Sequence, residues 1–74
     1  MVLLLLGSGE LAQVPYAVDV IRREGWLVCV GPDDEPLAAV GRNGVLAYTL
    51  NQKVVQEMVH GRQVRTLLAG TGLA

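Results

Sequence analysis

Apolar residues along the chain gather in four runs that are separated by glycine, proline and charged residues. The first two runs, VLLLL at residues 2–6 and WLVCV at residues 26–30, are continuously apolar, which is typical of strands buried on both faces. Residues 45–50 predict a third strand, and residues 63–69 predict a fourth that begins amphipathic and finishes apolar. The hydrophobic pattern therefore predicts four short strands.

Two of the intervening segments have apolar residues at helical spacing. In residues 15–24 the apolar side chains fall on one face, and Gly25 follows in the position of a residue that ends a helix. Asn51 is suited to cap a second helix, which Gly61 would end. We therefore expect two amphipathic helices. The predicted apolar face of the second helix consists of Val54, Val55, Met58 and Val59.

The segment 31–44 decides between two folds. Its stretch GPDDEPLAAV predicts a turn and then a short helix, capped by Asp34 or Glu35 and with Pro36 in its first position. With that helix, residues 1–74 form one small, three-layer, Rossmann-like α/β domain of four parallel strands. If the segment is instead a loop, the same elements suit a ferredoxin-like α+β sheet. A helix there would support the parallel sheet, and an antiparallel hairpin would exclude it.

The glycine-rich stretch after the first apolar run is the main candidate for a binding site. In a parallel α/β unit it would lie at the carboxyl edge of the sheet, where a helix N-terminus stabilises a phosphate. The stretch fits the motif G-x-G-x-x-G/A, which is also common at ordinary strand-to-helix turns. Phosphate or nucleotide binding and a purely structural turn therefore remain alternatives. The candidate site residues here are Gly7, Ser8, Gly9, Glu10 and Leu11.

Three further residues complete the predicted site. Asp33 follows the second strand, near the place where a dinucleotide-binding fold has the acid that holds a ribose. Gly70 and Thr71 follow the fourth strand, which would lie beside the first strand in the parallel sheet. Two glycine-rich turns would then form a crevice at one edge of the sheet. The implied ligand is a phosphate-bearing small molecule, such as an adenine nucleotide or a phosphoribosyl compound.

The stretch LLLLGSGEL, residues 3–11, resembles the start of the N-terminal (pre-ATP-grasp) domain of ATP-grasp ligases, most closely formate-dependent phosphoribosylglycinamide formyltransferase. The resemblance implies a Rossmann-like fold and a phosphoribosyl ligand. It also implies that the Glu-Leu pair, here Glu10 and Leu11, contacts that ligand. The ATP-grasp domains do not occur in these 74 residues, so we expect ligand binding without catalysis.

Charge and composition narrow the function classes. A net charge of −1 provides no long-range attraction for nucleic acid or an anionic membrane. The apolar start MVLLLL has no positively charged region before it and is too short for a membrane span. The single cysteine, Cys29, lies inside an apolar run, which favours a buried thiol in a reducing, cytoplasmic setting.

No catalytic constellation is visible in the sequence, since Ser8 is the sole serine and His60 the sole histidine. We therefore expect a soluble, non-enzymatic, phosphate-ligand-binding domain. A small sheet with two open edges also predicts a homodimer. The alternative function is a non-catalytic, homo-oligomeric interaction, assembly or regulatory module without a nucleotide site, in which the glycines only form turns.

Overall fold

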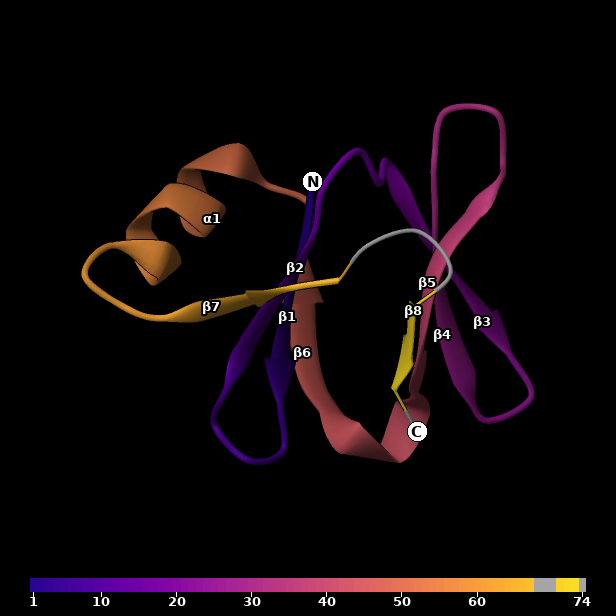
Figure 1. The fold of residues 1–74 in the computed structure, drawn as a ribbon, viewed down its shortest axis with the longest axis horizontal. Helices are drawn as coiled ribbons and strands as arrows, with labels where there is room; N and C mark the ends of the chain where they lie inside the picture. The colour runs from indigo at the N-terminus through magenta and orange to yellow at the C-terminus, as the bar shows by residue number, and fades with distance from the viewer. Residues whose placement is uncertain (68–70, 74) are drawn as a thin grey trace.

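Two β-sheets face each other in the part of the chain that the structure describes, and a single α-helix covers the outer side of one sheet (Figure 1). This computed structural model describes residues 1–67 and the backbone of residues 71–73. The strands in chain order are β1 (Val2–Leu6), β2 (Leu11–Val14), β3 (Asp19–Arg23), β4 (Trp26–Val30), β5 (Pro36–Gly41), β6 (Val45–Thr49), β7 (Val64–Thr66) and β8 (Thr71–Leu73). Strand β6 is preceded by the 3₁₀ turn η1 (Arg42–Gly44) and followed by the helix α1 (Gln52–Val59). The strand order is β6-β1-β2-β7 in the first sheet and β3-β4-β5-β8 in the second.

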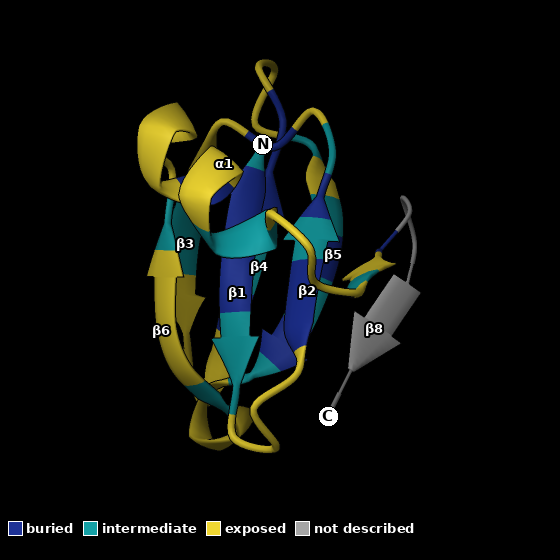
Figure 2. Cartoon of the chain, turned by 90° about the vertical axis from the view of Figure 1, so that its left-hand side faces the viewer, coloured by how far each residue is buried: buried dark blue, intermediate teal, exposed yellow. Residues whose placement is uncertain are grey.

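The continuous apolar run of β1 is explained by burial on both of its faces. Val2 and Leu4 point into the core between the sheets, where they pack in one cluster with Leu27 of β4. Leu3 points the other way and packs with Val55 of α1. Figure 2 shows α1 in front of the buried part of β1. The predicted two-sided burial is confirmed, with a second sheet on one side of β1 and one helix on the other.

The strand pairings contradict both predicted architectures. The pairs β1–β2, β1–β6, β3–β4 and β4–β5 are antiparallel, and among the described strands only β2–β7 and β5–β8 are parallel. The Rossmann-like α/β prediction is wrong, because that fold needs parallel strands with helices on both faces of one sheet. The ferredoxin-like alternative is also wrong, because its two helices would pack on a single sheet. The described chain is a two-sheet β domain with one helix.

Residues 15–24, which were expected to be helical, contain strand β3 and the turn that follows it. Gly25 ends the segment as predicted, but as the second residue of a two-residue turn in a β3–β4 hairpin, with a φ of +82°. Val20 packs against the core between the sheets, while Arg22 lies opposite Leu27. The β-branched residues of this segment fit a strand as well as a helix, and pairing with β4 decides between the two.

Residues 36–41 form strand β5 rather than the predicted short helix. Pro36 is the first residue of the strand, a place where its missing N–H does not interrupt the hydrogen bonds of a sheet. The preceding loop is a tight turn in which the Gly31 N–H donates to the Glu35 carbonyl at 2.9 Å, and Asp34 has a φ of +59°. Because β4 and β5 form an antiparallel hairpin, the parallel sheet is excluded.

The helix predicted after Asn51 is confirmed. The Asn51 Oδ1 atom accepts hydrogen bonds from the N–H groups of Lys53 at 3.0 Å and Val54 at 3.3 Å, which is the geometry of an N-cap. Of the predicted apolar face, Val55 is buried against the first sheet and Val54 is partly exposed. The strand predicted over residues 63–69 is observed as β7, and its last residues lie outside the described part of the chain.

Candidate functional site

The stretch GSG forms the turn of the β1–β2 hairpin and does not lead into a helix. The Leu6 N–H donates to the Glu10 carbonyl at 2.9 Å, and the Gly9 N–H donates to the Leu6 carbonyl at 2.9 Å. Gly9 has a φ of +87°, a conformation that glycine adopts readily, so the turn requires this residue on structural grounds. The structural alternative therefore accounts for Gly9, whereas at Gly7 a Cβ atom would meet only the Gly44 carbonyl oxygen, at an ordinary contact distance of 3.7 Å.

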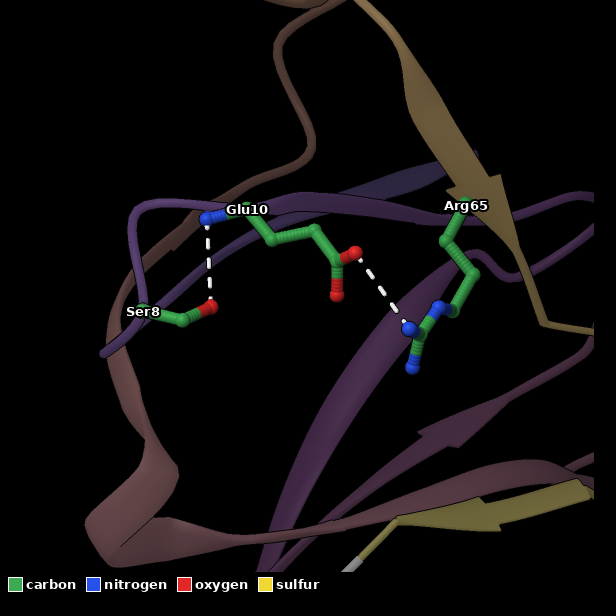
Figure 3. A network of polar contacts seen from close by, with 3 residues as sticks. All are labelled: Ser8, Glu10 and Arg65. Atoms are coloured by element: carbon green, nitrogen blue, oxygen red, sulfur yellow. Dashed lines mark hydrogen bonds and ion pairs between the residues drawn. The ribbon is translucent and has the colours of Figure 1, made fainter.

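Four of the five backbone N–H groups of residues 6–10, all but that of Ser8, donate hydrogen bonds inside the protein. The Gly7 N–H donates to the Gly44 carbonyl at 2.8 Å, and the Glu10 N–H donates to Ser8 Oγ at 3.3 Å (Figure 3). A phosphate site of the expected kind needs several N–H groups that point at the ligand together with a helix N-terminus. Strand β2 follows the turn, so the helix that motivated the prediction is not at this place.

The two residues assigned to ligand contact by the resemblance have structural partners. The Glu10 carboxylate forms an ion pair with Arg65 of β7 at 3.3 Å (Figure 3). Leu11 is 2% exposed and packs beneath α1 with Leu3 and Val55, so its side chain is part of the core and does not face the turn. This ion pair links two strands that are parallel neighbours at the edge of the first sheet. Both of its side chains are about half exposed, which limits its contribution to stability.

The remaining predicted site residues are not brought to this turn. Asp33 lies in the β4–β5 turn, at the opposite end of the two sheets from the β1–β2 turn (Figure 1). There its N–H donates to Glu35 Oε2 at 2.8 Å. Gly70 lies outside the described residues, and Thr71 begins β8, which pairs with β5 rather than with the first sheet. The crevice expected from a parallel sheet is therefore not formed by the described residues.

Reactive side chains do not gather into a chemical site in the described part of the chain. Cys29 is buried in the core between the sheets, and burial raises the pKa of its thiol to about 11. Within residues 1–67, His, Cys, Asp and Glu form no group of three that could hold a metal ion. The longest helix described, α1, has eight residues, and no described helix is long and apolar enough to cross a membrane.

The outer edge of β6 is an open, uncharged edge of the first sheet. Among the described strands β6 pairs only with β1, so it forms an edge of the first sheet. Three large apolar side chains are exposed along and just after it: Leu46 is 67% exposed, Tyr48 41% and Leu50 36%. The sequence VLAYTL of residues 45–50 contains no charged residue and no proline. In Figure 2 most of β6 is coloured as exposed, beside the buried strand β1.

An apolar groove adjoins this edge on the outer face of the first sheet, and we refer to it as the α1 groove. It lies between α1 and the strands β1 and β6, and it has a volume of about 210 Å³. Tyr48 and Val54 line it, and both side chains are partly exposed. The full set of lining residues is Leu3, Leu5, Leu11, Ala47, Tyr48, Thr49, Val54 and Met58.

A second hollow lies on the other side of β6, where the edges of the two sheets approach each other, and we call it the β3–β6 mouth. Its volume is about 320 Å³, and it is lined by Arg22, Leu27, Arg42 and residues 45–48. Arg22 lies directly opposite Leu27 in the β3–β4 hairpin. Because Leu27 points into the core, Arg22 also lies on the inner face of the second sheet, facing the mouth.

Sequence reasoning correctly predicted β6 as a strand but did not identify it as a candidate site. Its uncharged composition is visible in the sequence, yet the same composition fits a central strand. Only the strand order shows that β6 is at an edge. Comparison of the chain with protein families, with curated proteins and with solved structures gave no match.

Proposed function

We propose that this chain is a non-catalytic interaction module that binds a partner polypeptide strand along β6. The observation that carries the proposal is the combination of an open sheet edge with three exposed large apolar side chains on residues 45–50. Natural sheets protect their edges with charged residues, proline or short strands, because an open edge pairs readily with other chains. This edge strand has no charge and no proline in its sequence.

The mode of binding follows from the chemistry of a sheet edge. An added strand would take main-chain hydrogen bonds from β6, which provide affinity without sequence preference. Side chains of the added strand would alternate between the two hollows beside β6, since successive residues of a strand point to opposite faces. The α1 groove and the β3–β6 mouth lie on these two sides. This arrangement supports recognition of an extended peptide over recognition of a compact ligand.

One irregularity of β6 fixes where pairing is best. Leu5 of β1 pairs with Ala47 of β6, and the next residue of β1, Leu6, pairs with Val45. Leu46 therefore has no partner in β1 and is the extra residue of a β-bulge. A bulge twists an edge away from a regular ladder. We therefore place the added strand along residues 47–50, with Leu46 as an apolar contact at one end.

A second copy of the chain is the alternative occupant of this edge. The homodimer expected from the sequence stays a prediction, and it would use the same residues. The buried, unpaired Cys29 supports the reducing, cytoplasmic setting that we propose for the module.

Hydrogen exchange of residues 45–50 tests the proposed function. We expect amide groups of this segment to gain protection at high protein concentration or on addition of short extended peptides of acidic, neutral or basic composition. Leu46→Lys should weaken that protection, because a charge at an apolar edge opposes pairing. Val18→Lys is the matched control, since Val18 is also exposed, at 53%, and lies outside the β6 surface. No gain of protection under any of these conditions would overturn the proposal.

A further inference from the structure

We infer that the strand bound along β6 is an acidic peptide from a different protein, in which carboxylate side chains alternate with apolar ones. This inference rests on the proposed function and specifies the partner. It is carried by the β3–β6 mouth, which combines two arginine side chains with an apolar floor next to the open edge of β6.

The two arginines reach the mouth from different elements. Arg22 comes from β3, on the inner face of the second sheet, and Arg42 comes from η1, immediately before β6. Within the part of the chain that the structure describes, the ion pair of Arg65 with Glu10 is the only one formed, and neither Arg22 nor Arg42 has a carboxylate partner among these described residues. Two guanidinium groups beside one hollow attract an anionic group, and the planar guanidinium suits a carboxylate in particular.

The apolar residues of the mouth specify the rest of the ligand. Leu27 forms part of the buried core, and Leu46 and Tyr48 are exposed at the rim. A small inorganic anion would leave these apolar side chains in water, whereas an extended peptide covers them while its backbone pairs with β6. A peptide with alternating side chains presents its carboxylates to one side, here the arginines, and its apolar residues to the α1 groove.

Charge also distinguishes this partner from a second copy of the chain. Strand β6 of another copy would contribute no carboxylate, because residues 45–50 are uncharged. The acidic residue nearest to β6 in sequence on its C-terminal side is Glu57, on the exposed side of α1. In a symmetric pair of β6 strands, the pairing strand itself would therefore bring no carboxylate to Arg22 and Arg42. An acidic partner strand neutralises them in the same step in which it closes the edge.

The decisive experiment measures binding of three fluorescent peptides of equal length by anisotropy. The peptides alternate valine with glutamate, with glutamine or with lysine. We expect the glutamate peptide to bind at least tenfold more tightly than the glutamine peptide, and the lysine peptide to bind weakest. Raising the salt concentration should reduce this difference, because exposed charges are screened.

Variants of the two arginines test whether the preference for the glutamate peptide comes from the β3–β6 mouth. Arg22→Gln and Arg42→Gln should each weaken the glutamate peptide by about fivefold, which corresponds to the upper range for a partly exposed ion pair. Neither change should affect the glutamine peptide. Arg23→Gln is the matched control: it removes the same charge from the same strand, and Arg23 is outside the residues that line the mouth.

The outcomes separate the inference from the proposed function. Equal affinity for all three peptides would overturn the acidic partner while leaving strand binding along β6 in place. Self-association without peptide binding would likewise overturn the inference and assign the edge to a second copy. If neither peptides nor high protein concentration protect residues 45–50 from exchange, both proposals fail.

Discussion

Leu3 and Leu4 are neighbours in β1, yet their side chains enter two different apolar clusters. Leu4 packs between the sheets, and Leu3 packs with Val55 of α1. Strand β1 therefore contacts the second sheet through one face and α1 through the other. Substitutions of Leu3 and Leu4 can therefore destabilise the two apolar clusters separately.

Leu4→Ala should destabilise the whole domain. The side chain is fully buried, so its removal leaves a cavity between the sheets and lowers the free energy of unfolding by about 2–5 kcal/mol. Urea unfolding followed by the fluorescence of Trp26, the single tryptophan, measures the effect. Leu46→Ala is the control, since this leucine is 67% exposed and its loss should change stability by about 0.5 kcal/mol or less. Similar losses for both variants would contradict the core described here.

Leu3→Ala should loosen the attachment of α1 more than it affects the second sheet. Among the described residues, its cluster contains two other buried side chains, Leu11 and Val55, and the α1 residues Met58 and Val59 pack against this cluster. We expect faster hydrogen exchange in residues 52–59, with β3 and β4 changed much less. Equal acceleration in all strands would show that the helix and the sheets unfold as one unit.

Substitutions of Gly25 and Gly44 provide a matched test of the β3–β4 hairpin, which lies where the sequence predicts a helix. A Cβ atom would meet nothing within 4 Å at either position, but only Gly25 has a positive φ, at +82°. Gly25→Ala should therefore destabilise the domain by about 1–2 kcal/mol through backbone strain. Gly44→Ala should change stability by about 0.5 kcal/mol or less. A harmless Gly25→Ala would argue against the left-handed turn between β3 and β4.

Asn51→Ala should reduce the stability of α1 by about 1 kcal/mol, because two backbone N–H groups lose their acceptor. Asn51→Asp is the control, since a carboxylate accepts the same hydrogen bonds and favours a helix N-terminus. Helical circular dichroism and urea unfolding measure both effects. The cap assignment fails if the two variants lose the same stability.

Cys29 should make stability fall at alkaline pH. The folded state raises the pKa of the thiol from 9.0 to about 11, so the folded protein holds its proton more tightly than the unfolded chain. The resulting stabilisation is fully present below pH 9 and is lost as the pH rises through about 11. Cys29→Ala should remove this component of the pH dependence. In the folded protein at pH 8, alkylation of the thiol should be at least about a hundredfold slower than in denaturant, because less thiolate is present and the buried sulfur is shielded from the reagent.

The sequence predicted those elements whose signals are local. The apolar runs of β1 and β4 and the cap at Asn51 need no knowledge of the rest of the chain, and all three are observed. The errors at β3 and β5 arose where a short segment fits two periodicities and pairing with β4 decides between them. The GSG motif was misassigned for a related reason, since its meaning depends on whether a helix or a strand follows. The β6 surface was missed because an edge is a property of strand order, which short-range patterns do not encode.

The strand pairings also set an order of assembly during synthesis. The second sheet is built mainly from β3, β4 and β5, which are joined by tight turns and pair with their neighbours in the chain. In the first sheet, by contrast, β1 pairs with β6 and β2 pairs with β7, and both of these partners are synthesised much later. Contacts between distant segments form more slowly than local ones. In a nascent chain, the β3–β5 meander would thus form before β6 and β7 pair with the first sheet. The leucines of β1 would stay exposed during this time. The N-terminal hairpin is therefore the segment that most needs protection from aggregation during synthesis.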